Sequence, residues 1–267
     1  MSIKKNNIID PKLLELRTQI DKIDSQIIDL LINRMQIVDQ VALFKKSQDD
    51  ALYIKSNREA DMIKDISDRL KDYYPKSHII SIWRKIIAAS NLREQDVKIG
   101  LYNPNNITDY KYIINEYYSQ EFIVKNYDNA QLMIKEIKDK NINIALISCN
   151  LDNNDWWQYL EESNIKIFAK IPFQSNSDHK LYCLAIKNVE PSQNDATILS
   201  AKYNNDIDLC QIKRKITDLG YKLTIITHNS QNKSLLIEIL GYLDDKDLAK
   251  INDKISTNII GYCALDF

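Results

Sequence analysis

Glycine and cysteine are both scarce in this chain of 267 residues, which has 4 of each. Turns must therefore rely on Asn and Asp, which replace Gly most readily at such positions. The cysteines form no CxxC pair and have no His/Cys spacing typical of a metal site; they are Cys149, Cys183, Cys210 and Cys263. This argues against a disulfide framework or a structural metal and predicts reduced, buried thiols in a cytoplasmic protein.

Long apolar runs and charge of one sign are also missing. No apolar run approaches the roughly 20 residues that a membrane span needs, and the opening MSIKKNNIID lacks the apolar core of a signal peptide. The net charge is -1, and no long basic patch with interleaved aromatic residues is present. We therefore expect neither a membrane nor a nucleic acid as a partner.

The chain changes character near residue 96. Before this point helical periodicity dominates without any Gly, and after it short β-branched runs alternate with helical stretches. Helices are expected from residue 11 to about 46, from Ser56 to about Asp72 and from Pro75 onward. The first, at roughly 35 residues, is too long for an ordinary globular helix unless it pairs with others, so we expect it to span a dimer.

Arg34 and Lys45 interrupt the apolar stripe of that first helix. At about 100° per residue Lys45 lies within roughly 20° of Arg34. The apolar members of the stripe are Leu16, Ile20, Ile23, Ile27, Leu30, Val38 and Val41. Cations that face a core need acidic side chains or an anionic ligand, because an unpaired buried charge is too costly. The alternative for either residue is a long side chain that snorkels off the edge of the core. Arg17 lies at the edge of the stripe, where a surface arginine is the default.

Polar residues also interrupt the next two helices. Ser90 and Glu94 continue the apolar face that contains Trp83, although Ser90 would also suit a tight helix crossing and Glu94 a solvated last turn. Glu59 completes the pattern Ser56-Asn57-Arg58-Glu59, a capping box that would account for it without any functional role.

Taken together, LLELR at 13–17, Arg34, Lys45, the pair Arg58-Glu59 and Ser90 resemble the all-helical class of chorismate mutases, three-helix chains that entwine as dimers. The resemblance covers residues 11–95, and the spacing from Arg17 through Arg34 to Lys45 matches without a gap. It implies that residues 1–96 form an all-α domain that converts chorismate to prephenate in aromatic amino acid biosynthesis.

This reaction is a unimolecular Claisen rearrangement that needs no nucleophile, metal or cofactor, so the protein supplies restraint and charge complementarity. The resemblance implies that Arg34 and Arg17 each bind one carboxylate of the dianionic substrate. Lys45 would donate to the ether oxygen as it gains negative charge. Glu59 would accept a hydrogen bond from the ring hydroxyl, while Ser90 and the Arg58 region would place the ring and its carboxylate.

Two positions depart from the family pattern. Glu94 stands where relatives usually carry Gln, which donates a second hydrogen bond to the ether oxygen; a protonated acid can donate and a carboxylate cannot. We therefore expect activity to fall as pH rises, unless Gln95 takes this role after a shift of one residue. Ile54 and Lys55 occupy the loop where some relatives have an acidic group.

Helix geometry adds a constraint that is independent of the family. Arg17 and Lys45 are 28 residues apart, which is about 42 Å along a helix that rises 1.5 Å per residue. They cannot grip one small molecule from the same straight helix. We therefore predict an intertwined homodimer with shared active sites.

The second half of the chain is expected to be α/β. Strands are predicted at KIGLY, FIVKNY, NIALIS, KIFAKIPF and LYCLAI, with a helix near 128–139, and residues from about 196 onward follow a ferredoxin-like βαββαβ order. Trp156-Trp157 and Pro172-Phe173 could line the core or a ligand surface, and the core is favoured. His179 and His228 are expected on loops or strand ends, and nothing in the sequence assigns either of them a catalytic role.

This arrangement resembles the bifunctional chorismate mutase/prephenate dehydratases, with LLIEILGYLDDKDLAKI and NIIGY as the stretch most similar to an amino-acid-sensing ACT domain. The implied domains are 1–96, a truncated dehydratase-like region at 97–195 and an ACT-like domain at 196–267. The Thr-Arg-Phe motif of the dehydratases is absent. Three functions stay open: a chorismate mutase alone, a bifunctional enzyme that carries prephenate on to phenylpyruvate, and a non-catalytic helical dimer with a small-molecule-sensing tail.

Overall fold

The computed structural model describes residues 10–46, 52–104, 109–149, 155–161, 163–173, 179–192, 194–204, 208–252 and 255–265. The chain divides into two compact units, residues 1–49 and 50–267, and each is described by itself. The opening residues 1–9 and most of the predicted break between the first two helices, at 47–51, lie outside the described ranges.

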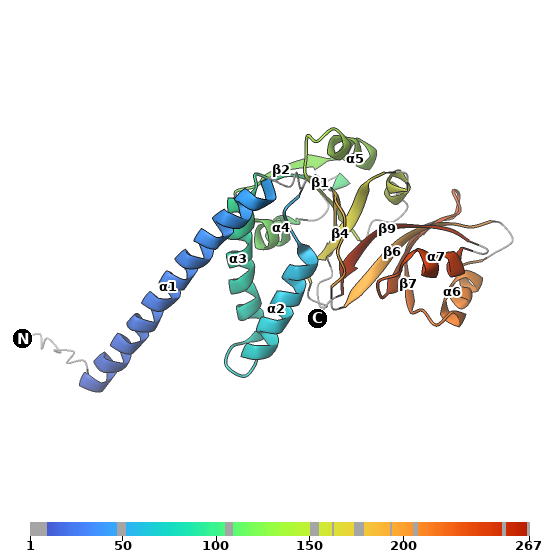
Figure 1. Ribbon diagram of the computed structural model, residues 1–267. Coiled ribbons are helices and arrows are strands. Elements are labelled where there is room, and N and C mark those ends of the chain that lie inside the picture. Colours follow the sequence, from blue (N-terminus) through green and yellow to red (C-terminus); the bar gives the residue numbers. More distant parts are fainter. Residues whose placement is uncertain are drawn as a thin grey trace, which may run out of the picture. The chain divides into compact units, whose positions relative to one another are not determined.

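The first unit contains one uninterrupted helix, α1 (Pro11–Lys46) (Figure 1). Its bounds agree with the predicted helix from 11 to about 46. Pro11 occupies the first helical position, where its missing N–H costs nothing. No further Pro and no Gly follows within the helix, so nothing in its sequence breaks it.

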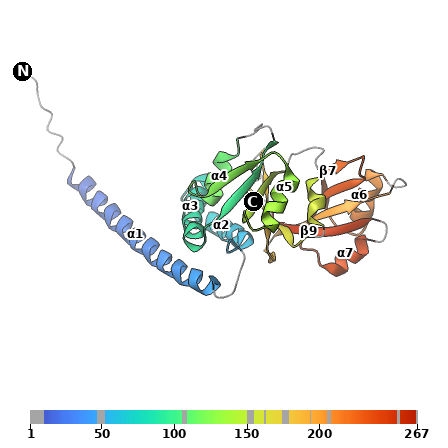
Figure 2. The same ribbon diagram turned by 90° about the horizontal axis from the view of Figure 1, so that it is seen from above.

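The second unit begins with two helices, α2 (Ser56–Leu70) and α3 (Lys76–Glu94). They lie side by side, as Figures 1 and 2 both show. Pro75 stands directly before α3 as its N-cap, where a proline ends one helix and permits the next. The two helices share a small apolar core made of Ile63, Ile79, Ile80 and Ile87, with Trp83 packed against it.

The remainder of this unit is built on one nine-stranded sheet with the order β2-β1-β3-β5-β4-β9-β6-β8-β7. Its strands are β1 (Lys98–Tyr102), β2 (Ile123–Tyr127), β3 (Ile144–Ser148), β4 (Ile165–Ile171), β5 (Leu181–Ile186), β6 (Asp195–Lys202), β7 (Leu223–Asn229), β8 (Ser234–Leu240) and β9 (Ser256–Ala264). β1 pairs in parallel with β2 and β3, whereas β5 runs antiparallel to β3 and β4. Every strand predicted from the sequence is present.

Helices cover both faces of the first five strands. α4 (Lys111–Tyr118) packs on one face, and α5 (Ala130–Lys138) packs on the other together with the short 3₁₀ helix η2 (Trp156–Leu160). Trp156 and Trp157 are fully buried there, as predicted. The core under α4 also includes Leu52, Ile54 and Ala60, so the start of α2 packs against the sheet.

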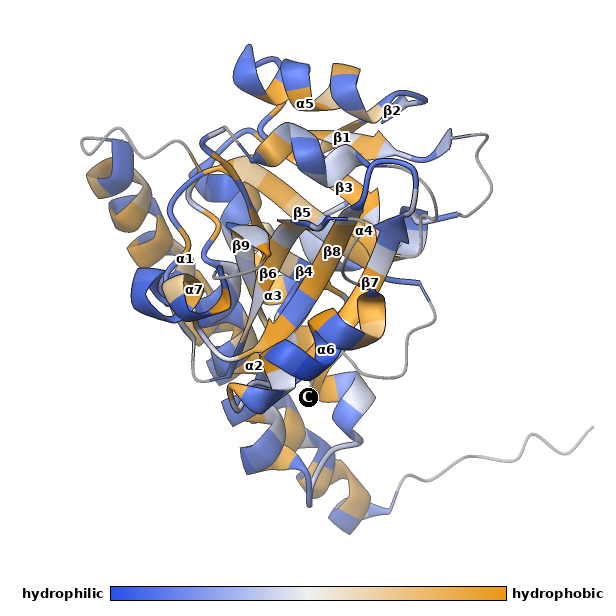
Figure 3. Ribbon diagram, turned by 90° about the vertical axis from the view of Figure 1, so that its right-hand side faces the viewer, coloured by the Kyte–Doolittle hydropathy of each residue, from blue (hydrophilic) through white to orange (hydrophobic). Residues whose placement is uncertain are grey.

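The last four strands form the predicted βαββαβ unit. They run in the order β9-β6-β8-β7 with antiparallel pairing throughout, which is a ferredoxin-like arrangement. α6 (Leu209–Asp218) and α7 (Asp245–Ile251) contribute to one core on the same face of these strands. Figure 3 shows a largely hydrophilic outer side on α6 and hydrophobic strands beneath it.

The two parts of the sheet meet where β4 lies beside β9. Ile167 and Gly261 form the register pair between these parallel strands. A Cβ added to Gly261 would lie 2.2 Å from the Ile167 carbonyl oxygen, which is far inside van der Waals contact. The absence of a side chain at this position therefore allows the two parts of the sheet to join.

Among the described helices, none is long and apolar enough to cross a membrane. None of the four cysteines, all of which lie in the described ranges, forms a disulfide there. Cys183 and Cys263 are buried as predicted, Cys149 is partly buried, and Cys210 is exposed, which corrects the expectation that every thiol is buried. Cys210 lies in the amphipathic helix α6, whose outer side faces solvent.

Candidate active site

The three predicted cations of the first unit lie along α1. Arg17 is exposed, whereas Arg34 and Lys45 are each partly buried. Because α1 is continuous, the separation of about 42 Å between Arg17 and Lys45 applies to the folded chain. One molecule of the size of chorismate cannot contact both residues of a single α1.

Most of the apolar stripe of α1 is exposed in the single chain, so the stripe does not pack into a core there. The exposed members are Leu16, Ile20, Ile23, Ile27, Leu30 and Val41. Leu30, at the centre of the stripe, is 67% exposed. A contiguous apolar surface of this kind is uncommon in a monomer and marks an interaction site, so the stripe remains available to another polypeptide.

Glu59 lies on the inner side of α2, and its role differs from the predicted capping box. The N-cap of α2 is Lys55, which makes no side-chain capping bond. Glu59 is 9% exposed, and it accepts hydrogen bonds from Arg84 Nη1 at 3.3 Å and from Asn91 Nδ2 at 3.0 Å. A buried carboxylate needs such partners, and α3 supplies both of them.

Arg84 of α3 is a buried functional group that was not anticipated from the sequence. Its guanidinium lies against two aromatic rings, 4.2 Å from the centroid of Tyr117 and 4.3 Å from that of Phe173. Burial raises the pKa of Tyr117 to about 12, although the charge of Arg84 acts in the opposite direction. The spacing of Arg84 between Ile80 and Ile87, which places all three on one helix face, was the signal that could have revealed it.

Ser90 and Glu94 lie one turn apart on α3. Ser90 is buried, and its hydroxyl donates to the carbonyl of Ile86 at 2.9 Å. Glu94 is the last residue of the helix and is partly buried. The side-chain oxygen of Gln95 accepts a hydrogen bond from the backbone N–H of Tyr53 at 3.1 Å, so Gln95 ties the loop before α2 to the end of α3.

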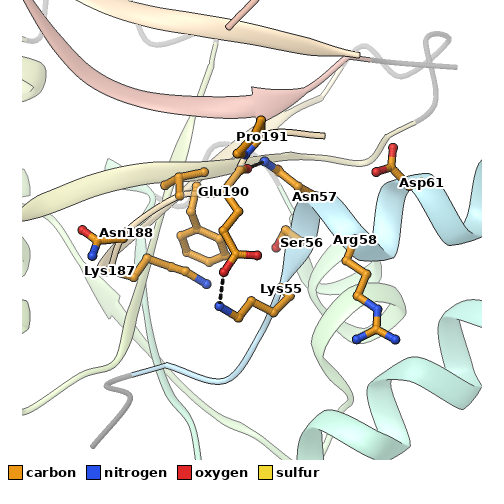
Figure 4. Close-up of a pocket in the computed structure, with 11 residues that line it drawn as sticks. Lys55, Ser56, Asn57, Arg58, Asp61, Lys187, Asn188, Glu190 and Pro191 are labelled. Atoms are coloured by element: carbon orange, nitrogen blue, oxygen red, sulfur yellow. Dashed lines mark hydrogen bonds and ion pairs between the residues drawn. The ribbon is translucent and has the colours of Figure 1, made fainter. Parts of the chain in front are cut away.

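Arg58 lines a small cavity of about 110 Å³ at the start of α2. On the other side of this cavity, Lys55 forms an ion pair of 2.8 Å with Glu190, and this hydrogen bond and charge lower the pKa of the Glu190 carboxyl. Lys187 donates to the Ile54 carbonyl and Asn57 donates to the Glu190 carbonyl. Figure 4 shows Arg58 extending away from the Lys55–Glu190 pair. The loop that departs from the family pattern is therefore held by the segment that follows β5.

The predicted residues are thus divided between the two units. Arg17, Arg34 and Lys45 belong to the first unit, and Arg58, Glu59, Ser90 and Glu94 belong to the second. Within the second unit, hydrogen bonds from Arg84 and Asn91 fasten Glu59 to the helix that carries Ser90 and Glu94. No three His, Cys, Asp or Glu side chains of the described ranges gather where they could hold a metal ion.

The two histidines singled out from the sequence have ordinary surroundings. His179 lies just before β5 and makes an edge contact with Tyr110, with ring centroids 6.4 Å apart. His228 is exposed near the end of β7. Phe173 is buried, as predicted for Pro172-Phe173, and it also contacts Arg84.

Comparison with known proteins places the first part of the chain in a family. Residues 16–95 match the family model described as chorismate mutase type II. This match confirms the resemblance to the chorismate mutases predicted from the sequence, and with it the predicted isomerase activity on chorismate. No curated protein is significantly similar to the chain.

The solved structures that resemble part of the chain include a dehydratase and an acylase. A prephenate dehydratase from Streptococcus mutans has 14% sequence identity and a TM-score of 0.44, covering 64% of this chain and 100% of that one. GqqA, described as a novel type of quorum quenching acylase, has 10% identity and a TM-score of 0.47, covering 63% of this chain and 95% of that one. Both TM-scores are below 0.5, so neither resemblance supports an inference about activity.

Proposed function

Because residues 16–95 belong to the chorismate mutase type II family, we propose that two copies of this chain pair through α1 and rearrange chorismate to prephenate in sites that both chains complete. The observation that carries the pairing is the continuous helix α1, which has an exposed apolar stripe and separates Arg17 from Lys45 by about 42 Å. A second α1 covers the stripe and brings Arg17 of one chain toward Lys45 of the other.

In this proposal each cation has one task. Arg34 and the partner chain's arginine at position 17 bind the two carboxylates of chorismate, because a planar guanidinium matches a carboxylate with two parallel hydrogen bonds. Lys45 donates to the ether oxygen, where negative charge grows as the C–O bond breaks. A donor aimed at charge that develops in the transition state lowers the barrier without any covalent step.

The second group of residues places the ring. Glu59 accepts from the ring hydroxyl, and Arg58 and Ser90 position the ring and its carboxylate. Glu94 donates to the ether oxygen in its protonated form. Arg84 and Asn91 engage one oxygen of Glu59 each, and a carboxylate oxygen can accept more than one hydrogen bond, so Glu59 keeps capacity for the substrate.

We further propose the division into a mutase domain at 1–96, a dehydratase-like region at 97–195 and an ACT-like domain at 196–267. The ferredoxin-like order of β6 to β9 supports the last of these. Cysteines in the reduced form, as in the described ranges, support a cytoplasmic location.

The test is incubation of the purified full-length protein with chorismate. Chorismate should disappear, and its product should give phenylpyruvate only after acid treatment, which converts prephenate chemically. Arg34→Ala should abolish the loss of chorismate, whereas Lys46→Ala, at an exposed position of the same helix, should leave it unchanged. Phenylpyruvate formed without acid would assign dehydratase activity as well, and a wild-type protein that leaves chorismate intact would refute the proposal.

A further inference from the structure

Arg84 is a positive charge in the interior of the second unit, with 1% of its side chain exposed. Its Nη1 donates to Glu59 Oε2 at 3.3 Å, whereas Nε and Nη2 have no hydrogen-bond partner among the residues that the structure describes. A guanidinium is costly to bury unless its surroundings compensate. Glu59 supplies part of this compensation, and other groups that pack against the guanidinium must supply the rest.

Two aromatic rings beyond the family-matched segment lie against the guanidinium. Tyr117 belongs to α4 and Phe173 follows β4, and their ring centroids lie 4.2 and 4.3 Å from the guanidinium carbon. The rings are nearly perpendicular, with centroids 5.3 Å apart. The backbone N–H of Phe173 donates to the Tyr117 hydroxyl at 2.7 Å, so the two rings fix each other and leave the cation one well-defined position.

The position of Glu59 follows from that of Arg84. Arg84 contacts Oε2, and Asn91 contacts Oε1 at 3.0 Å. Rotation of the carboxylate out of this plane would break both contacts. The carboxylate plane is therefore fixed by α3, and α3 is in turn fixed by the two rings of the α/β region.

We propose that Arg84 is a positioning residue for Glu59 and that Tyr117 and Phe173 hold it, so the mutase reaction depends on a part of the chain outside residues 16–95. The inference rests on the proposed function, in which Glu59 binds the ring hydroxyl of chorismate. Misplacement of a binding group by about 1 Å can cost up to about a hundredfold in rate, so a remote ring can affect the reaction without touching the substrate.

The experiment compares kcat/KM of full-length variants in a double-mutant cycle. Glu59→Gln and Arg84→Met should each lower kcat/KM by about tenfold to a hundredfold. The kcat/KM of the double variant should be no lower than that of the less active single variant. Both single variants should raise KM, and the ratio of the change in KM to the change in kcat should be the same in the two. A loss of folded protein alone would lower the apparent kcat and leave KM unchanged. Arg84→Lys should recover part of the activity.

Lys85→Met is the matched control. Lys85 is the next residue of α3 and also reaches α4, donating to the Asn115 carbonyl at 2.9 Å and pairing with Glu116 at 3.3 Å. Because it does not touch Glu59, its removal should change kcat/KM by less than about twofold.

Phe173→Leu keeps the test decisive if Arg84→Met does not fold. It removes one ring, leaves the Arg84–Glu59 pair intact and should lower kcat/KM by about threefold to tenfold with a raised KM. Wild-type kinetics in Phe173→Leu, or losses from Glu59→Gln and Arg84→Met that multiply, would overturn the inference while the mutase activity stands. Absence of activity in the wild-type protein would instead overturn the proposed function together with this inference.

Discussion

Mixing two inactive variants tests whether the active sites are shared. Arg17→Ala removes a carboxylate ligand, and Lys45→Ala removes the donor to the ether oxygen. Truncating one partner of a desolvated charge pair costs about 2 kcal/mol or more, so each variant alone should lose at least about 30-fold in kcat/KM. The separation of these residues on α1, about 42 Å, requires that any site containing both draws them from two chains.

The magnitude of the recovery follows from counting sites. After equal mixing and full exchange, about half of the dimers of a two-fold symmetric protein are mixed. A mixed dimer has one site with both residues intact and one site that lacks both. About a quarter of the wild-type sites are therefore restored, and chorismate loss should recover to about that level.

The assay follows chorismate consumption after tagged chains have exchanged, with the mixed dimers verified by sequential purification on the two tags. A mixture of Arg17→Ala with the double variant R17A/K45A is the control, because every site in it lacks the arginine and no activity should return. Verified mixed dimers that stay inactive would refute the shared site.

Three further predictions concern single positions. Glu94→Gln should flatten the pH profile of kcat/KM, since an amide donates at every pH whereas a carboxylic acid donates only in its protonated form; an unchanged profile would exclude Glu94 from the site. Gly261→Ala places a methyl group 2.2 Å from the Ile167 carbonyl oxygen and should lower the free energy of unfolding by about 1–3 kcal/mol or more. Urea unfolding measures this loss, and wild-type stability would contradict the tight approach of β4 and β9. Burial raises the pKa of Cys183 to about 12, so this thiol stays protonated at neutral pH and should resist iodoacetamide, while the exposed Cys210 should react. Peptide mass mapping identifies the labelled residue, and rapid labelling of Cys183 in the folded protein would contradict this.

Most of the fold could be predicted from the sequence because the pattern in each segment agrees with its final environment. The continuous helix α1 has no internal Gly or Pro, and strands such as β3 are buried on both faces and read as unbroken apolar runs. The helix α4 could not be predicted, because its residues KYIINEYY mix β-branched and aromatic side chains with polar ones and lack a clear helical or strand period.

The site was less predictable, for a physical reason that Glu59 illustrates. Its local sequence fits a capping box, yet Lys55 is the N-cap and Glu59 pairs instead with residues 25 and 32 positions further along the chain. A capping box is a local interaction that contributes little to stability. A buried cation such as Arg84, in contrast, requires an anion that the fold brings close, at any distance along the chain. A local sequence pattern cannot show whether Glu59 caps α2 or pairs with Arg84, because the pairing depends on tertiary packing.

The segment that matches the mutase family therefore relies on two different sources of support. α2 and α3 pack against the sheet of their own chain, through Leu52 and Ile54 in the shared core and through the rings on Arg84. The stripe of α1 is exposed in the single chain and, in the proposed dimer, is covered by the second chain. A change at Phe173 alters the packing of α2 and α3 against their own sheet and leaves the pairing through α1 intact. A change at Leu30 alters the pairing alone. Loss of Glu59 placement and loss of dimerisation should therefore be separable in this protein, although both would appear as loss of the same reaction.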